Sequence, residues 1–96
     1  MKTEAVIRVR FLTPEEGGRK TPIEGERYGC PLMLNGQGFD CRFVLDGYAC
    51  FELGKSYEIP VKFLNPVLAL KELREGTEIS LWEGKIIARG VVIKVM

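Results

Sequence analysis

The sequence contains no histidine, only three cysteines and no long hydrophobic run. Without histidine, a serine or cysteine nucleophile lacks its usual base, and a zinc site lacks one of its common ligands. The cysteines are Cys30, Cys41 and Cys50, an odd number with no Cys-x-x-Cys pair, which argues against a disulfide framework and a zinc site. We therefore expect reduced, partly buried thiols, no bound metal and no cofactor.

A strong charge of one sign is also absent, because 14 basic side chains face 13 acidic ones, for a net charge of +1. A domain held to nucleic acid by bulk charge is usually strongly basic, so such binding would need a local basic patch. No apolar run approaches membrane-spanning length, and the N-terminus lacks a signal-peptide pattern. These features predict a cytoplasmic protein that does not enter a membrane.

What is present is the pattern of a small all-β domain over residues 1–96, long enough for one hydrophobic core. Asn35-Gly36 is a strong hairpin signal, and Asp46-Gly47 marks a further turn. Short strands are predicted at residues 5–12, 30–34, 39–45, 48–53, 57–63, 79–82 and 85–96. Six or seven such strands, with no long helix, predict a small closed antiparallel β-barrel of about six strands.

Two places in this pattern are less regular. Pro60 lies inside an alternating strand, which predicts either an edge strand or a missing donor at a gap in the barrel. In residues 65–76, Pro66 follows a capping Asn65, and this order predicts one or two helical turns that end near Gly76. The expected apolar face of this helix contains Val67, Leu70 and Leu73.

The chemistry of catalysis is missing. Leu53-Gly54-Lys55-Ser56 resembles the end of a phosphate-binding loop, but Ala49 stands where that motif needs its first glycine, and a strand rather than a helix follows. The paired carboxylates, Glu15 with Glu16 and Glu24 with Glu26, lie in predicted exposed loops that do not tune them for acid or base work. We expect no enzyme, no GTPase domain and no bound nucleotide.

The most informative segment is Glu15-Glu16-Gly17-Gly18-Arg19-Lys20-Thr21-Pro22, a polar loop directly after the first strand. This segment resembles the opening of the C-terminal β-barrel domain (domain 3) of elongation factor Tu. The likeness continues to the end of the chain, where Glu83-Gly84 and Gly90-Val91-Val92-Ile93-Lys94-Val95 resemble that domain's Glu-Gly turn and last strand. It covers about residues 5–96 and implies a barrel without the GTPase domain.

The resemblance also implies a site, because this barrel of elongation factor Tu grips the T-stem of aminoacyl-tRNA with the Gly-Gly-Arg loop and the Glu-Gly turn. From the residues themselves, basic side chains of the long loop would contact phosphates while Tyr28 stacks. The competing interpretation is a solvated loop in which Arg19 binds Glu15 or Glu16. The candidate RNA-binding residues are Arg19, Lys20, Thr21, Arg27, Tyr28, Glu83 and Gly84.

The chain departs from that domain at several positions. Lys20 stands where histidine is usual, Asn65 stands where histidine or lysine is frequent, and Tyr28-Gly29-Cys30-Pro31 replaces an Arg-Pro-Gln-Phe segment. Two functions therefore stay open: a non-catalytic module that binds tRNA or another structured RNA, and a barrel that packs on a translation factor or another protein. The second would use an apolar patch of Val67, Leu68, Leu70 and Leu73.

Overall fold

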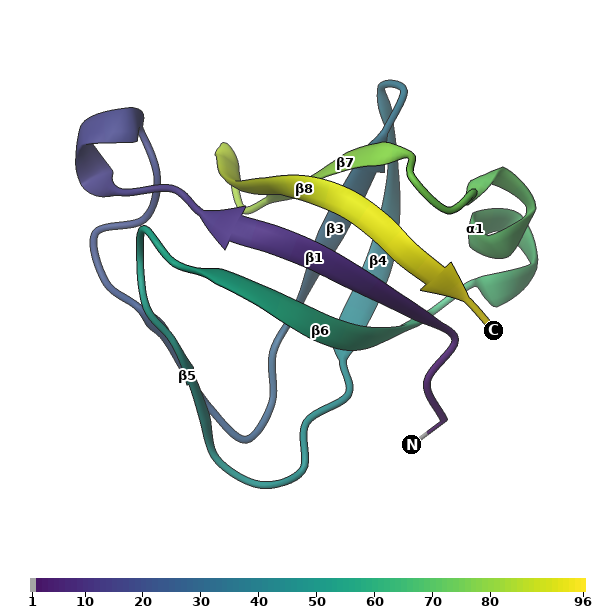
Figure 1. The fold of residues 1–96 in the computed structure, drawn as a ribbon, viewed down its shortest axis with the longest axis horizontal. Helices are drawn as coiled ribbons and strands as arrows, with labels where there is room; N and C mark the ends of the chain where they lie inside the picture. Colours follow the sequence, from purple (N-terminus) through teal and green to yellow (C-terminus); the bar gives the residue numbers. More distant parts are fainter. Residues whose placement is uncertain (1) are drawn as a thin grey trace.

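The computed structural model describes residues 2–96, so Met1, the first residue of the predicted domain, lies outside the description. Six strands close into an antiparallel barrel in the order β1-β6-β4-β3-β7-β8, and β2 pairs with β5 in a separate ribbon (Figure 1). This confirms the predicted closed barrel of about six strands. The elements are β1 (Ala5–Phe11), the 3-10 turn η1 (Pro14–Glu16), β2 (Ile23–Gly25), β3 (Gly29–Leu34), β4 (Gln37–Phe43), β5 (Ala49–Phe51), β6 (Ser56–Phe63), α1 (Pro66–Glu72), β7 (Glu78–Trp82) and β8 (Ile86–Val95).

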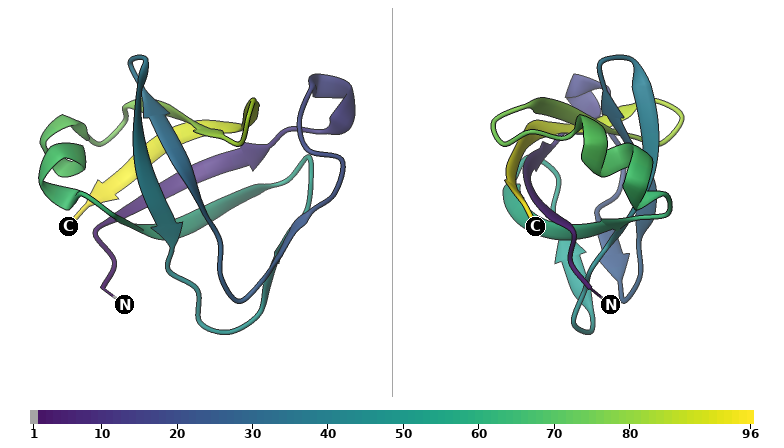
Figure 2. Two further views of the ribbon diagram at one scale, coloured as in Figure 1. Left: turned by 180° about the vertical axis from the view of Figure 1, so that it is seen from behind. Right: turned by 90° about the vertical axis from the view of Figure 1, so that its right-hand side faces the viewer.

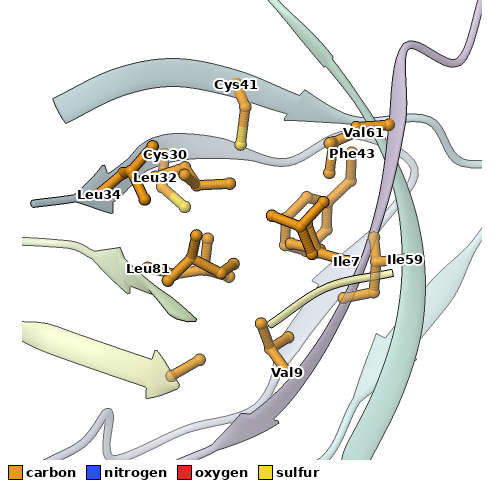
Figure 3. Packing of buried hydrophobic residues seen from close by; sticks show 14 of the residues in the cluster. Ile7, Val9, Cys30, Leu32, Leu34, Cys41, Phe43, Ile59, Val61 and Leu81 are labelled. Carbon is orange, nitrogen blue, oxygen red and sulfur yellow. The ribbon is translucent and has the colours of Figure 1, made fainter. Parts of the chain in front are cut away.

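The core fills the barrel with the inward residues of alternating strands. Along β1, every second side chain from Ala5 to Phe11 is buried, and along β6 the same holds from Ile59 to Phe63. Figure 3 shows side chains from β1, β3, β4, β6 and β7 meeting in this interior. A strand period of two places one face of each strand in the core, so the alternation in sequence sets which side of each strand faces inward.

The two open ends of the barrel are closed by different elements. The helix α1 lies at one end, while η1 and the β2–β5 ribbon lie at the other (Figure 2). Ala69 of α1 and Leu73 just after it join the buried cluster, and so do Ile23 of β2 and Phe51 of β5. The core is therefore continuous from the helix to the ribbon.

The helix is confirmed, and its predicted apolar face is right at Leu70 and Leu73 but wrong at Val67. Ala69 and Leu73 are buried, Leu70 is half-buried, and Val67 is 77% exposed. Residues four apart share a helix face, whereas Val67 lies about 200° around the helix from Ala69. The helix also ends at Glu72, before the expected stop near Gly76, because Leu73 is already extended with φ −75° and ψ 135°.

The irregular strand and the hairpin follow their local chemistry. Pro60 does not lie on an edge strand, since β6 pairs with both β1 and β4. The Pro60 carbonyl accepts a hydrogen bond from the Val44 N–H at 2.8 Å, just beyond the last β4–β6 pair. The N–H that Pro60 lacks is therefore missing at the end of this ladder and not in its middle. Between β3 and β4, Asn35 and Gly36 both have positive φ (48° and 78°), as a type I′ turn requires.

Candidate nucleic-acid interface

The loop after β1 is fixed before it reaches Arg19. Glu16 accepts hydrogen bonds from the Thr13 N–H at 2.9 Å and from Arg10 Nη1 at 2.9 Å, which ties η1 to the end of β1. Gly17 then takes a left-handed conformation with φ 88°. Gly18 passes so close to the backbone that an added Cβ would lie 2.4 Å from the Leu12 carbonyl oxygen. Glycine is therefore required at Gly17 by its backbone conformation and at Gly18 by the close approach of Leu12.

Beyond the glycines, Arg19 enters a cluster with Tyr28 and Glu83, which we call the Arg19 cluster. Arg19 Nη1 contacts Glu83 Oε1 at 2.7 Å and Oε2 at 2.6 Å, and the Tyr28 hydroxyl donates to Oε2 at 2.5 Å. Arg19 Nε also donates to the Thr21 carbonyl at 3.0 Å. The Gly-Gly-Arg loop and the Glu-Gly turn, far apart in sequence, thus meet at one point.

The alternative partner for Arg19 is wrong. Glu16 pairs with Arg10, and the carboxylate that binds Arg19 belongs to Glu83, in the turn between β7 and β8. Burial of Tyr28, with its hydrogen bond to Glu83 as the next cause, raises the pKa of the phenol well above its ordinary value. The hydroxyl therefore keeps its proton and stays a donor to Glu83. In this cluster the positive charge of Arg19 is offset by the carboxylate of Glu83.

A surface groove of about 700 Å³ lies beside Tyr28. Within residues 2–96 no Asp or Glu lines it, and none of its three cations forms an ion pair. We call it the basic groove; its lining residues are Arg27, Tyr28, Gly29, Arg42, Phe43, Lys62 and Leu64. Positive charge is thus concentrated and uncompensated at one place on a nearly neutral protein.

The strand register explains this concentration. Arg42 of β4 and Lys62 of β6 are directly opposite partners, and Gly29 of β3 is opposite Arg42 on its other side. A Cβ on Gly29 would lie 2.4 Å from Arg42 Nη1, so the missing side chain of Gly29 is what lets Arg42 lie across β3. Like charges directly opposite each other destabilise a sheet. Here the Arg42 guanidinium leans over β3, away from Lys62, which lessens that cost and leaves two cations exposed on neighbouring strands.

Tyr28 joins the two regions. Its hydroxyl belongs to the Arg19 cluster, its ring packs on the buried Phe43 with ring centroids 5.0 Å apart and planes inclined by 55°, and the residue lines the groove. An aromatic ring held in this way on a basic surface can stack on a flat group or a base. The groove therefore offers cations and one half-buried ring.

The predicted site residues separate into three groups. Arg19, Tyr28 and Glu83 are brought into contact, and Arg27 lines the groove beside them. Lys20, Thr21 and Gly84 are exposed and line no part of the groove. Arg42 and Lys62 were missed by sequence reasoning. The sequence did indicate that both residues lie on the outward faces of alternating strands. It did not indicate that β4 pairs with β6 rather than with β5, and this pairing brings the two residues together.

The predicted apolar patch is partly wrong. Leu73 is 2% exposed because it packs into the end of the barrel, and Leu70 packs partly against the same core. Val67 and Leu68 remain exposed, and Leu64 beside the groove is exposed with them. No helix within residues 2–96 has the length and hydropathy needed to cross a membrane.

Comparison of the chain with protein-family models and with curated proteins gives no match.

Proposed function

We propose that this protein is a non-catalytic, cytoplasmic RNA-binding module that holds the sugar–phosphate backbone of a structured RNA such as tRNA in the basic groove. The observation that carries the proposal is the set of three unpaired cations, Arg27, Arg42 and Lys62, around a groove with no acidic lining residue. Phosphate oxygens are the natural partners for such cations, and backbone contacts position RNA without reading its sequence.

The directly opposed Arg42 and Lys62 support a ligand that carries more than one negative charge. Bound phosphates would neutralise these two cations on adjacent strands and release counterions from the RNA. The ring of Tyr28, held by Phe43 beneath it and by Glu83 at its hydroxyl, would stack on an unpaired base at the edge of the groove.

In this proposal the Arg19 cluster orients the groove rather than binding phosphate with a full charge. Arg19 and the Tyr28 hydroxyl both donate hydrogen bonds to Glu83, and this shared partner fixes Tyr28. Tyr28 in turn forms one wall of the groove. The resemblance to the C-terminal domain of elongation factor Tu remains part of the proposal. In our proposal, the Gly-Gly-Arg loop and the Glu-Gly turn of this chain form one surface. The basic groove adds Arg42 and Lys62 to that surface.

The test is the affinity of the protein for a bulk tRNA pool, with and without the aminoacyl group, measured by fluorescence anisotropy. We expect micromolar binding that weakens by an order of magnitude or more between about 50 and 200 mM salt. Arg42→Gln should weaken binding, whereas Lys94→Gln, which removes one cation outside the groove, serves as the matched control. Absence of binding even at the lower salt concentration would refute the proposal.

One observation favours the second function, a barrel that packs on another translation-related protein. Leu64, Val67 and Leu68 are 55%, 77% and 54% exposed, a small apolar surface at the α1 end of the barrel. Apolar side chains gathered at a surface mark candidate contact sites. If this is the working surface, Val67→Asp with Leu68→Asp should abolish partner capture and leave tRNA binding as in the wild type.

A further inference from the structure

Cys30 and Cys41 are direct partners in the β3–β4 ladder, and both side chains are buried in the barrel. Figure 3 shows the two sulfur atoms pointing into the same interior beside Leu32. The third cysteine, Cys50, is exposed on β5 and lies outside this pair. The chain therefore places two of its three thiols on facing positions of one hairpin.

The register fixes how far apart the two residues are. The Phe43 N–H donates to the Tyr28 carbonyl at 2.9 Å, and hydrogen-bonded pairs recur at every second position of an antiparallel ladder. Cys30 and Cys41 therefore form a hydrogen-bonded pair, for which the Cα atoms lie about 5.5 Å apart. Disulfides span Cα distances of about 4.4 to 6.8 Å and Cβ distances of about 3.5 to 4.5 Å. The Cα spacing of this pair lies within that range, and its Cβ atoms, about 5 Å apart as in any directly opposite pair, have to approach by about 1 Å for the bond to form.

We propose that Cys30 and Cys41 are a site of reversible oxidation, at which a peroxide converts the dithiol into a cross-strand disulfide inside the barrel. This inference is independent of the proposed RNA binding.

The two thiols differ in a way that assigns their roles. The neighbouring Cys41 thiol lowers the pKa of the Cys30 thiol, against the opposing effect of burial. The Cys30 thiol, together with burial, raises the pKa of Cys41. Since the thiolate is the nucleophile, and Cys30 is 5% exposed whereas Cys41 is fully buried, Cys30 is the residue that reacts first.

The chemistry balances with hydrogen peroxide as the only oxidant. The Cys30 thiolate attacks one peroxide oxygen, the O–O bond breaks, and the departing hydroxide takes a proton to become water, which leaves Cys30 as a sulfenic acid. The Cys41 sulfur then attacks the Cys30 sulfur, the S–O bond breaks, and the departing hydroxide takes the Cys41 proton. One peroxide is reduced to two waters, and each sulfur loses one electron.

The test uses the folded, reduced protein treated with one equivalent of hydrogen peroxide, alkylated and digested with trypsin. Cleavage after Arg27 and Arg42 leaves both cysteines on the peptide 28–42, while Cys50 lies on the separate peptide 43–55. We expect peptide 28–42 to lose two hydrogens and take no alkyl group, and to stay linked after cyanogen bromide cleavage at Met33. A reductant should restore both thiols.

Two controls keep the result specific. In the unfolded chain in urea, oxidation should also join Cys50 to the other cysteines, whereas the native Cys50→Ser variant should give only the Cys30–Cys41 bond. The oxidised native protein should melt several degrees higher, because the bond closes a loop of about ten residues. The proposal fails if the native protein alkylates at both Cys30 and Cys41 after peroxide, or if these residues become sulfinic acids without a link.

Discussion

In the Arg19 cluster a guanidinium lies 2.6 Å from a carboxylate, whereas in the neighbouring basic groove three cations have no acidic partner within residues 2–96. The two regions share Tyr28, whose hydroxyl donates to Glu83 in the first and which is a lining residue of the second. Similar residue types therefore lie side by side in opposite electrostatic states. The paired arginine holds a loop and a turn together, and the unpaired cations are left to bind something else.

This difference changes which residues should dominate RNA binding. Sequence motifs pointed to Arg19, but its Nη1 and Nε groups already donate to Glu83 and to the Thr21 carbonyl. Arg42 and Lys62 belong to no motif, yet they are directly opposite partners on two adjacent strands. Charge that is not compensated within the protein has more to gain from a phosphate than charge that is already paired.

Reversal of a groove charge should give the largest effect. We expect Arg42→Glu to weaken tRNA binding by roughly tenfold to a hundredfold, because a phosphate contact becomes a repulsion. The same change replaces a like-charged pair with an opposite-charged pair opposite Lys62, so stability should stay equal or rise by about 0.2–1 kcal/mol. Anisotropy and urea unfolding measure the two quantities. Lys94→Glu is the matched reversal outside the groove, and equal losses of binding in both variants would contradict the assignment.

Release of Arg19 should have a smaller and opposite effect on binding. Glu83→Gln removes the carboxylate that offsets Arg19, so affinity for tRNA should rise about threefold at low salt while stability falls by about 1 kcal/mol. The same two measurements check this variant. A fall in affinity would mean that the loss of the Glu83 bond to Tyr28, or of a contact between the carboxylate and RNA, outweighs the charge released on Arg19.

Tyr28 links the regions and gives a prediction at high pH. Its pKa is raised in the folded protein by burial and by the bond to Glu83, so this contribution to stability is complete below the ordinary pKa of 10.0. As pH rises above 10, the unfolded chain ionises first and the contribution is lost. Urea unfolding at a series of pH values should show a steeper alkaline decline for the wild type than for Tyr28→Phe. Parallel declines would contradict the role of the hydroxyl.

The smallest effect concerns the loop anchor. Hydrogen bonding to the Thr13 backbone, followed by the bond from Arg10, lowers the pKa of Glu16 from its ordinary value of 4.5. Its contribution is therefore present above pH 4.5 and is lost as pH falls below that value. Glu16→Gln should show a slightly flatter acid limb in thermal unfolding and unchanged tRNA affinity at pH 7. An unchanged acid limb would mean that the anchor contributes nothing.

The sequence predicted those features whose causes are local. Alternation placed the inward faces of β1 and β6, and Asn35-Gly36 specified the β3–β4 turn. The helix after Pro66 was also predictable, but its buried face was predicted only in part, because Ala69 rather than Val67 packs inward with Leu73. That face is set by where α1 meets the end of the barrel, which only the closed fold determines.

The site was predictable only in part for a similar reason. The loop at Arg19 and the turn at Glu83 were each visible as motifs, while their contact depends on the order of strands around the barrel. Arg42 and Lys62 were ordinary outward-facing residues in sequence. They become opposite partners because β4 pairs directly with β6, although β5 lies between these strands in the sequence. No short sequence pattern encodes such a non-local register.

The most direct test of the central claim is the salt dependence of tRNA binding for the wild type, the double variant Arg42→Gln with Lys62→Gln, and the control Lys94→Gln. Each phosphate contact contributes nearly one unit to the slope of log affinity against log salt concentration, so the double variant should lose roughly two units. The control should keep the slope of the wild type. If the double variant also keeps that slope, its cations do not contact phosphate, and the basic groove is not the RNA-binding surface.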